Sequence, residues 1–516
     1  MTGLLASAAV RQDVPMTRAY LSDRPDRNAA PVRPTEQDEV AAAGSELIGG
    51  PVGRRVAPGA GGWWTPVRVV ALLGLGMFVL GMVQKAPCFN GAWFSGQTSQ
   101  YVHACYSDIP HLFAGRGFAD GLVPYFDRIP DRVSGGMAYL EYPVLTGVFM
   151  EVASWLTPGG GDLQHREQLY WMVNGGMLMV CAAVLFVCAT RTHRDRPWDG
   201  LHVALAPALA LTATINWDLL AVALTAAAML MWSRSRPLAA GVLIGLATAA
   251  KLYPVLLLGP LLVLCWRAGH LRAFGKALGG AAVSWLCVNL PVMLLAPQGW
   301  SKFYSFSQER PVDFGSIWLV ISQRTGNPVP DANLYATLLM ALGCAGIAAL
   351  ALRSPRRPRL AQLALLVVAL FILTNKVYSP QYVLWLIPLV ALARPKWRDV
   401  LIWQACEVIY FIGIWLYLAY TGSGDKHHGL PPEGYQLVIL VHLVGTLYLC
   451  AVVVRDALMP ERDVVRRNGS DDPGGGVLDR APDVFTLGGG GRRAQHGKPV
   501  PFDDPQVRWG TTTTPH

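Results

Sequence analysis

One short stretch of the chain, residues 105–110, contains residue types that could support acid–base chemistry. Asp108 lies in this stretch, and a second acidic residue, Glu141, follows after about thirty residues beside Tyr142. A carboxylate held at a membrane face can take a proton from a hydroxyl group, so Asp108 is a candidate general base. Glu141 and Tyr142 are candidate substrate contacts. The alternative is that these acids only cap helices at the membrane surface.

Two cysteines precede Asp108 in the chain. Of the nine cysteines in the chain, only Cys88 and Cys105 lie outside the predicted membrane spans. In an oxidising compartment they would pair, and closing that loop would contribute roughly 3 kcal/mol and tether Asp108. Two free thiols are the alternative. The other seven cysteines are expected to pack as small apolar residues.

Two lysines lie at turns that share one pattern. Lys251 precedes Tyr253 and a proline, and Lys376 precedes Tyr378 and a second proline. One interpretation is that proline breaks each helix while lysine and tyrosine reach the membrane interface. The other is that both cations line a cavity for an anionic lipid headgroup, because an unpaired ammonium inside a membrane is costly.

Several common sites have no signature in this sequence. No HExxH, CxxC or related spacing supports a metal site, and neither a phosphate-binding glycine loop nor a GxSxG turn is present. The net charge of +9 comes from short basic clusters between apolar runs. That placement indicates a membrane protein and argues against a nucleic-acid partner.

Composition defines the elements that must position these residues. The chain has 516 residues, of which 52% are hydrophobic and only 15% charged. Residues 1–62 and 456–516 are polar and rich in glycine or proline, so we expect disordered tails. Residues 63–455 form the predicted all-α membrane domain of about twelve spans. The predicted spans are 67–84, 167–190, 199–216, 217–233, 237–252, 254–266, 277–296, 333–352, 360–376, 378–393, 399–420 and 435–454.

The basic residues also predict sidedness. Alternate connections hold 15 Lys and Arg in 35 residues, whereas the opposite loops hold 9 in 132. The first set is therefore expected on the cytoplasmic side, together with both termini. Residues 85–166 become one large extracytoplasmic loop, with the apolar segment 143–157 as a helix at the outer interface. The protein is expected in the cell membrane, with its active site facing outward.

Three further acidic residues fall at membrane depth. Ionisable groups there are functional candidates by default. Asp218 lies near the outer end of a span, where it could contact substrate or cap the helix. Glu407 is expected to be paired inside the bundle, and Glu151 lies in the interfacial segment.

A series of short motifs occurs in a fixed order along the predicted membrane domain. They are Asp108-Ile109, Arg116-Gly117, Pro124-Tyr125, Glu141-Tyr142-Pro143, Asn216-Trp217-Asp218, the run from Ala240 to Gly245 leading to Lys251-Leu252-Tyr253-Pro254, and Ser379-Pro380-Gln381-Tyr382. Their order resembles the GT-C superfamily of polyprenyl-phosphate-sugar-dependent glycosyltransferases, specifically glycosyltransferase family 87. The sequence departs from the commoner pattern of that family in carrying a single Asp108 instead of an acidic pair, and Val144 instead of a second proline.

The resemblance implies a GT-C-like bundle that transfers a hexose, usually mannose, from a polyprenyl phosphate to a glycan or glycolipid acceptor of the cell envelope. It implies inversion by direct displacement, with an acidic residue of the first outer loop as base, which corresponds to Asp108. The phosphate is its own leaving group, so no cofactor is expected.

Charge and sidedness, instead of a family motif, select the residues for the donor phosphate. Lys251, Lys376 and Arg310 are the candidate cations, with Tyr253 and Tyr378 beside the lysines. The rival function is a transporter or flippase of lipid-linked sugars. Against it, the first outer loop is long, and repeated halves are not visible beyond the two lysine turns. The sequence does not predict an oligomeric state.

Overall fold

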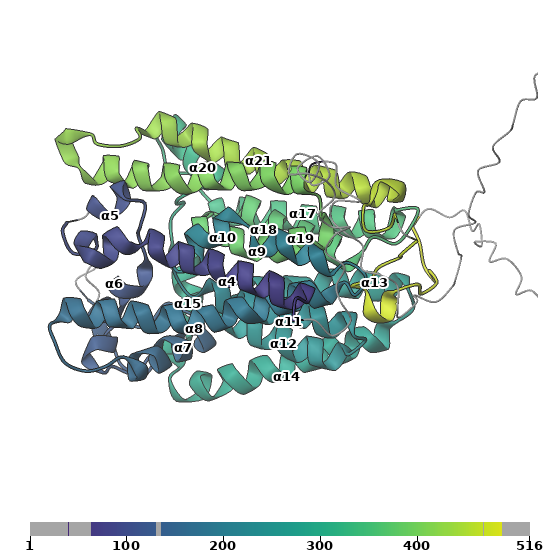
Figure 1. Cartoon of the computed structure of the whole chain (residues 1–516), viewed down its shortest axis with the longest axis horizontal. Helices are drawn as coiled ribbons and strands as arrows, with labels where there is room; N and C mark the ends of the chain where they lie inside the picture. Colours follow the sequence, from purple (N-terminus) through teal and green to yellow (C-terminus); the bar gives the residue numbers. More distant parts are fainter. Residues whose placement is uncertain (1–39, 41–62, 97, 131–135, 468, 488–516) are drawn as a thin grey trace, which may run out of the picture.

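The computed structural model describes residues 40, 63–96, 98–130, 136–467 and 469–487. Within these residues, six helices are long and apolar enough to cross a membrane. They lie roughly side by side along the long axis of the molecule (Figure 1). The six are α4 (Pro66–Gln84, continued by the turn Cys88–Ala92), α8 (Leu163–Thr192), α14 (Leu271–Leu295), α17 (Ala332–Arg353), α20 (Trp397–Gly422) and α21 (Pro432–Leu458).

Shorter apolar helices complete the bundle. Several are too short to cross a bilayer core of about 30 Å on their own, at about 1.5 Å per residue. Their bounds are α7 (Val144–Leu156), α11 (Asp218–Ser233), α12 (Pro237–Ala250), α13 (Leu258–Arg267, preceded by the turn Tyr253–Leu257), α18 (Leu360–Thr374) and α19 (Val383–Ala393, preceded by the turn Pro380–Tyr382).

The helices α18 and α19 form the centre of the bundle. Every residue of α19 is buried, and α18 is buried along nearly its whole length. Protein therefore surrounds this hairpin on all sides, which explains how two short apolar helices are accommodated. The predicted all-α, polytopic fold class is confirmed.

One predicted span is interrupted. The segment 199–216 was expected as a regular helix, but the structure breaks it into a turn (Pro197–Gly200), α9 (Leu201–Ala204) and α10 (Pro207–Thr212). Pro207 lacks a backbone N–H and begins a new helix, so the earlier one cannot run through it. Beyond α10 the chain is not helical, and its carbonyl groups are available to other partners.

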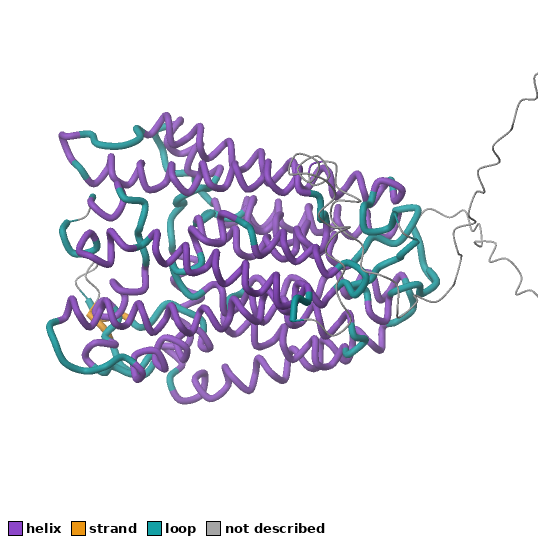
Figure 2. Tube along the Cα trace, in the orientation of Figure 1, coloured by secondary structure: helices purple, strands orange, loops and turns teal. Residues whose placement is uncertain are grey.

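The connections at one end of the bundle contain the remaining elements. They include a two-stranded antiparallel ribbon that pairs Ile129 with Ala138. We call this end, at the left of Figures 1 and 2, the Asp108 end. The elements are α5 (Ser99–Val102), α6 (Asp108–Gly115), β1 (Ile129–Pro130), β2 (Met137–Ala138), α15 (Pro297–Glu309) and α16 (Ile317–Thr325).

The opposite end is closed by the C-terminal segment. A disordered tail was expected from residue 456 onward, but α21 continues to Leu458, and many of the described residues up to 487 pack against the bundle. Asp463 is fully buried and pairs with Arg359 at 2.7 Å. Residues 488–516, and 1–62 apart from Val40, lie outside the described residues.

Arginines of the predicted cytoplasmic clusters hold this segment. Asp483 accepts from Arg267 at 2.6 Å and from Arg357 at 2.7 Å. Arg394 bridges Asp399 and Asp456 at 2.8 and 2.6 Å. Each of these arginines is buried and paired with an aspartate, so the clusters anchor the described part of the C-terminal segment to the bundle.

Candidate functional site

The backbone around Asp108 is held by the interrupted segment after α10. Ser107 caps α6 by accepting from the N–H of Ile109. Its own hydroxyl donates to the carbonyl of Thr214 at 2.7 Å, and the N–H of Asp108 donates to the carbonyl of Ile215 at 2.8 Å. The break in the predicted span thus supplies the carbonyls that fix Asp108.

The carboxylate of Asp108 lies in a largely desolvated setting. Burial raises its pKa from 3.8 to about 6, and the negative charge of Asp218 contributes in the same direction. The hydroxyl of Tyr106, which donates to Oδ1 at 2.7 Å, and the charges of Lys251 and Arg310 lower the pKa. Asp108 is therefore more basic than an ordinary aspartate, yet ionised at neutral pH.

Asp218 and Lys251 form a buried ion pair. Nζ of Lys251 lies 2.6 Å from Oδ1 of Asp218, and the indole N–H of Trp385 donates to Oδ2 at 3.0 Å. Asp218 is only 2% exposed, whereas 18% of the lysine side chain is accessible. The lysine therefore has both a fixed partner and an accessible edge.

Two tyrosine rings flank the same ammonium group. The rings of Tyr142 and Tyr382 have their centroids 6.0 and 5.9 Å from Nζ of Lys251. Both distances suit cation–π attraction. The predicted substrate contacts Tyr142 and Asp218 are thus brought together with Lys251, although they come from three separate segments.

Close packing of α12 against α14 determines where Lys251 lies. A Cβ atom at Gly241 would lie 2.0 Å from the carbonyl oxygen of Ala277, and one at Gly245 would lie 2.2 Å from that of Ala281. Only glycine permits this approach, which is typical of membrane helix pairs. Lys251 follows the last residue of α12 directly, so this contact positions its side chain.

Glu141 is engaged by another charge. The guanidinium of Arg116 forms a bidentate pair with its carboxylate, with Nε 2.8 and 3.0 Å from the two oxygens. The next two residues are fixed by Tyr125, whose hydroxyl donates to the carbonyls of Tyr142 and Pro143 at 3.1 and 2.8 Å. Glu141 therefore orients the segment that carries Tyr142.

Arg310 approaches the site from the end of α15. It pairs with Asp313 at 2.6 Å, and its charge acts on Asp108. Asp313 raises the pKa of the Arg310 guanidinium despite partial burial, so the arginine remains charged. Its side chain is about one-third exposed and can reach a ligand.

Lys376 is placed differently from Lys251. Its ammonium donates to the carbonyls of Ser307, Gln308 and Arg310 at 3.2, 3.0 and 2.6 Å. These groups end α15, where unpaired carbonyls attract a cation. In this structure Lys376 therefore secures the backbone of Arg310.

The two predicted phosphate-site tyrosines are buried. Tyr253 stacks on Trp385 with centroids 4.5 Å apart and donates to Thr225. Tyr378 donates to Glu407 at 3.1 Å, and Glu407 also accepts from Trp403 and Thr446. The expected pairing of Glu407 inside the bundle is thus present. In the part of the chain that the structure describes, neither tyrosine hydroxyl contacts Lys251.

Cys88 and Cys105 are joined by a disulfide with a Cα–Cα distance of 5.7 Å. The bond ties the end of α4 to the residue before Tyr106. The indole of Trp93 also donates to the carbonyl of Cys105 at 3.2 Å. The segment leading to Asp108 is therefore held by two contacts at Cys105, the disulfide and the hydrogen bond from Trp93.

Some site residues were not selected from the sequence. Tyr106 lies two residues before Asp108, and Tyr382 ends the motif Ser379-Pro380-Gln381-Tyr382. Their places beside or within these motifs are a signal by which the sequence could identify both tyrosines. Trp385 lies in an apolar run without any signal. Among the described residues, no group of three His, Cys, Asp or Glu side chains could hold a metal ion.

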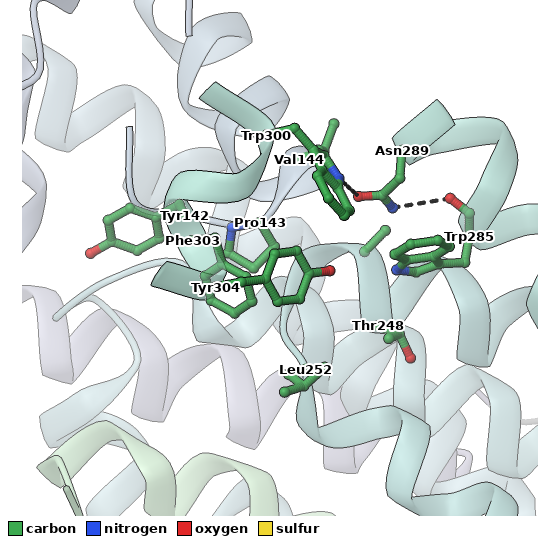
Figure 3. A pocket seen from close by; sticks show the side chains of 11 residues that line it. Tyr142, Pro143, Val144, Thr248, Leu252, Trp285, Asn289, Trp300, Phe303 and Tyr304 are labelled. Atoms are coloured by element: carbon green, nitrogen blue, oxygen red, sulfur yellow. Dashed lines mark hydrogen bonds between the residues drawn. The ribbon is translucent and has the colours of Figure 1, made fainter. Parts of the chain in front are cut away.

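A small aromatic pocket adjoins Tyr142 (Figure 3). Tyr142 contributes to its wall, and its hydroxyl points away from the other side chains drawn. Trp300 donates to Asn289 at 3.1 Å, and Asn289 donates to the carbonyl of Trp285. The pocket therefore lies between α12, α14 and α15, next to the Lys251 turn.

Comparisons with known proteins indicate one family. None of the curated proteins matches the chain. Residues 139–375 match the family model of glycosyltransferase family 87, a segment that contains Glu141, Tyr142, Asp218, Lys251 and Arg310. With its apolar helices, the chain is similar over this segment to the membrane glycosyltransferases of family 87.

Proposed function

We propose that this enzyme transfers a hexose, with mannose as the first candidate, from a polyprenyl-phosphate sugar to a glycolipid or polysaccharide of the cell envelope. The observation that carries the proposal is the meeting of one basic carboxylate, Asp108, with two accessible cations, Lys251 and Arg310. A base and a phosphate-binding pair are the two parts that such a displacement needs.

The proposed reaction is a single displacement. Asp108 takes the proton from an acceptor hydroxyl as its oxygen forms a bond to the anomeric carbon of the donor sugar. The bond from that carbon to the phosphate oxygen breaks, and its electron pair leaves with the phosphate. Attack opposite to the phosphate inverts the anomeric centre, and no cofactor is required.

Lys251 and Arg310 would stabilise the charge on the departing phosphate. Lys251 is held by Asp218 and retains an accessible edge, so a phosphate oxygen can approach it without breaking the ion pair. Arg310 can offer two parallel N–H groups to a phosphate. Lys376 would act indirectly, through the carbonyls that position Arg310.

We further propose that the Asp108 end faces the extracytoplasmic side. Two features support this orientation. The disulfide Cys88–Cys105 lies at that end, and disulfides persist in oxidising compartments. The arginine clusters lie at the opposite end, as expected for the cytoplasmic side.

The decisive test is transfer of radiolabelled mannose from polyprenyl-phosphate mannose in membranes that contain the protein. Asp108→Asn should abolish transfer, whereas Asp120→Asn, an exposed aspartate in the same loop, should not. Undiminished transfer by Asp108→Asn would exclude it as the base. If no lipid-phosphate sugar acts as donor but labelled lipid crosses the membrane, the protein is a flippase.

A further inference from the structure

Four aromatic rings pack together beside Asp108 in a cluster that we call the aromatic platform: Tyr101, Tyr106, His111 and Trp415. Tyr106 is its centre, with ring centroids 5.7 Å from Tyr101, 5.8 Å from His111 and 5.0 Å from Trp415. Tyr101 and Trp415 are nearly parallel, with 6° between their planes. The four rings therefore pack into one cluster contributed by α5, the loop before α6, α6 itself and α20.

The platform is not simply a buried packing contact. Tyr101, Tyr106 and His111 are each partly exposed. Trp415 lies behind them, 3% exposed, and its buried indole nitrogen has no hydrogen-bond partner among the described residues. Trp415 therefore supports the three partly exposed rings from behind, and those three rings form the accessible face.

Several contacts hold the platform rigidly. The imidazole of His111 bonds to the side-chain oxygen of Gln100 at 2.8 Å, which joins α6 to α5. The disulfide at Cys105 fixes the residue before Tyr106. Aromatic side chains on a fixed backbone lose little conformational entropy on binding, as a preformed binding surface requires.

The platform is also connected to the proposed base. The hydroxyl of Tyr106 donates to Asp108, so the ring at the centre of the platform touches the carboxylate itself. The cations Lys251 and Arg310 come from other elements, at the ends of α12 and α15. The proposed phosphate-binding cations and the aromatic platform thus lie on separate elements around one carboxylate.

We propose that the aromatic platform binds the acceptor, and that the acceptor hydroxyl belongs to a sugar ring. The apolar C–H face of a pyranose carries small positive charges that suit the negative face of an aromatic ring. A sugar lying on Tyr101 and Tyr106 would bring one of its hydroxyls to Asp108. The catalytic role rests on the proposed function, whereas sugar binding by the platform does not.

The kinetic test compares Tyr101→Leu with Phe126→Leu, a control that removes an exposed ring from the same loop. The probes are octyl α-D-mannopyranoside as acceptor and polyprenyl-phosphate [14C]mannose as donor. Tyr101→Leu should raise the acceptor KM at least tenfold and leave the donor KM within twofold. Tyr101→Phe should restore the acceptor KM, because it keeps the ring.

A binding test without chemistry separates this inference from the proposed function. Saturation-transfer NMR with methyl α-D-mannopyranoside is recorded on the protein in nanodiscs of phosphatidylglycerol and phosphatidylethanolamine. The wild type should give a signal that Tyr101→Leu and, independently, His111→Leu reduce at least fivefold, while Phe126→Leu retains it. Both platform variants must elute from a size-exclusion column at the same volume as the wild type, so that loss of the NMR signal reflects loss of sugar binding and not misfolding.

The outcomes are distinct. Transfer from the lipid donor with an unchanged acceptor KM in Tyr101→Leu overturns the platform and leaves the proposed function standing. Signal loss in the platform variants without any transfer keeps the platform and overturns the function. No sugar signal from the wild type, or equal loss in Phe126→Leu, also overturns the platform.

Discussion

Lys251 and Asp218 lie 2.6 Å apart because α11 and α12 are antiparallel neighbours, with Asp218 at the start of the first and Lys251 just beyond the end of the second. Among the described residues, the carboxylate of Asp218 is engaged by Lys251 and by the indole of Trp385. The carboxylate thus neutralises a cation that would otherwise be costly at this depth.

This pair should show strong energetic coupling. Lys251→Met leaves the carboxylate of Asp218 buried and uncompensated, and breaking a buried pair in this way costs about 3–5 kcal/mol. The double variant with Asp218→Asn removes both charges and should recover much of that loss. Thermal unfolding in detergent of the two single variants and the double variant measures this double-mutant cycle. Lys276→Met, which changes an exposed lysine, is the control. Additive effects of the two single changes would contradict the coupling.

The pH dependence of transfer should report the pKa of Asp108. Because the base must be ionised, kcat/KM should rise with pH, reach half its plateau near pH 6 and level off about one pH unit higher. Tyr106→Phe removes a hydrogen bond that lowers this pKa, so its rising limb should move to higher pH. Asp218→Asn removes a charge that raises the pKa, so its limb should move to lower pH. Tyr139→Phe, elsewhere in the loop, is the control, and shifts in the reverse directions would exclude Asp108 as the titrating group.

Asp108 should also lower the stability of the protein. Its folded pKa of about 6 exceeds the usual 3.8, so the folded state favours the protonated form, and stability falls as pH rises from about 4 to 6. Above pH 6 the cost is up to about 3 kcal/mol. Asp108→Asn should therefore unfold at a higher temperature at pH 7.5 than the wild type, while at pH 4 the difference should shrink. A lower unfolding temperature at both pH values would contradict this expectation.

The sequence predicted the helices well but the site only in part. Apolar runs located nearly every membrane helix, because burial in lipid or protein demands them. The run at 199–216 failed, because hydropathy registers neither the break at Pro207 nor the end of α10 at Thr212, beyond which free carbonyls bind Ser107 and Asp108. Periodicity cannot reveal such long-range partners.

The two lysine turns illustrate the same limit. Lys251 and Lys376 share a local pattern, yet one pairs with a carboxylate and the other with three carbonyls. The difference lies in what tertiary packing places opposite each ammonium, Asp218 in one case and the end of α15 in the other. Likewise, the polar composition of residues 456–487 predicts disorder. The described residues of this segment are ordered because buried ion pairs hold them, and composition does not show such pairs.

The disulfide between Cys88 and Cys105 should be needed for full transfer activity. Cys88→Ser, Cys105→Ser and the double variant should each reduce transfer to a similar extent, because all three release the segment that carries Tyr106 and Asp108. Cys287→Ser, an exposed free cysteine on α14, should have no effect. Transfer assays with and without reducing agent, with labelling of released thiols, measure this. Full activity after complete reduction would show that the hydrogen bonds of Ser107 and Trp93 suffice.

The C-terminal segment should be needed for a stable bundle. Asp463 accepts from Arg359 through both carboxylate oxygens and from Gln362, with the aspartate and the arginine fully buried. Asp463→Asn leaves Arg359 without its counter-charge and should cost about 3–5 kcal/mol. Glu461→Gln removes an acid of the same segment that is exposed, so it should be neutral within about 0.5 kcal/mol. Thermal unfolding in detergent compares the two, and equal unfolding temperatures would show that the segment is held by its apolar contacts instead, since Val464 and Val465 are buried beside Asp463.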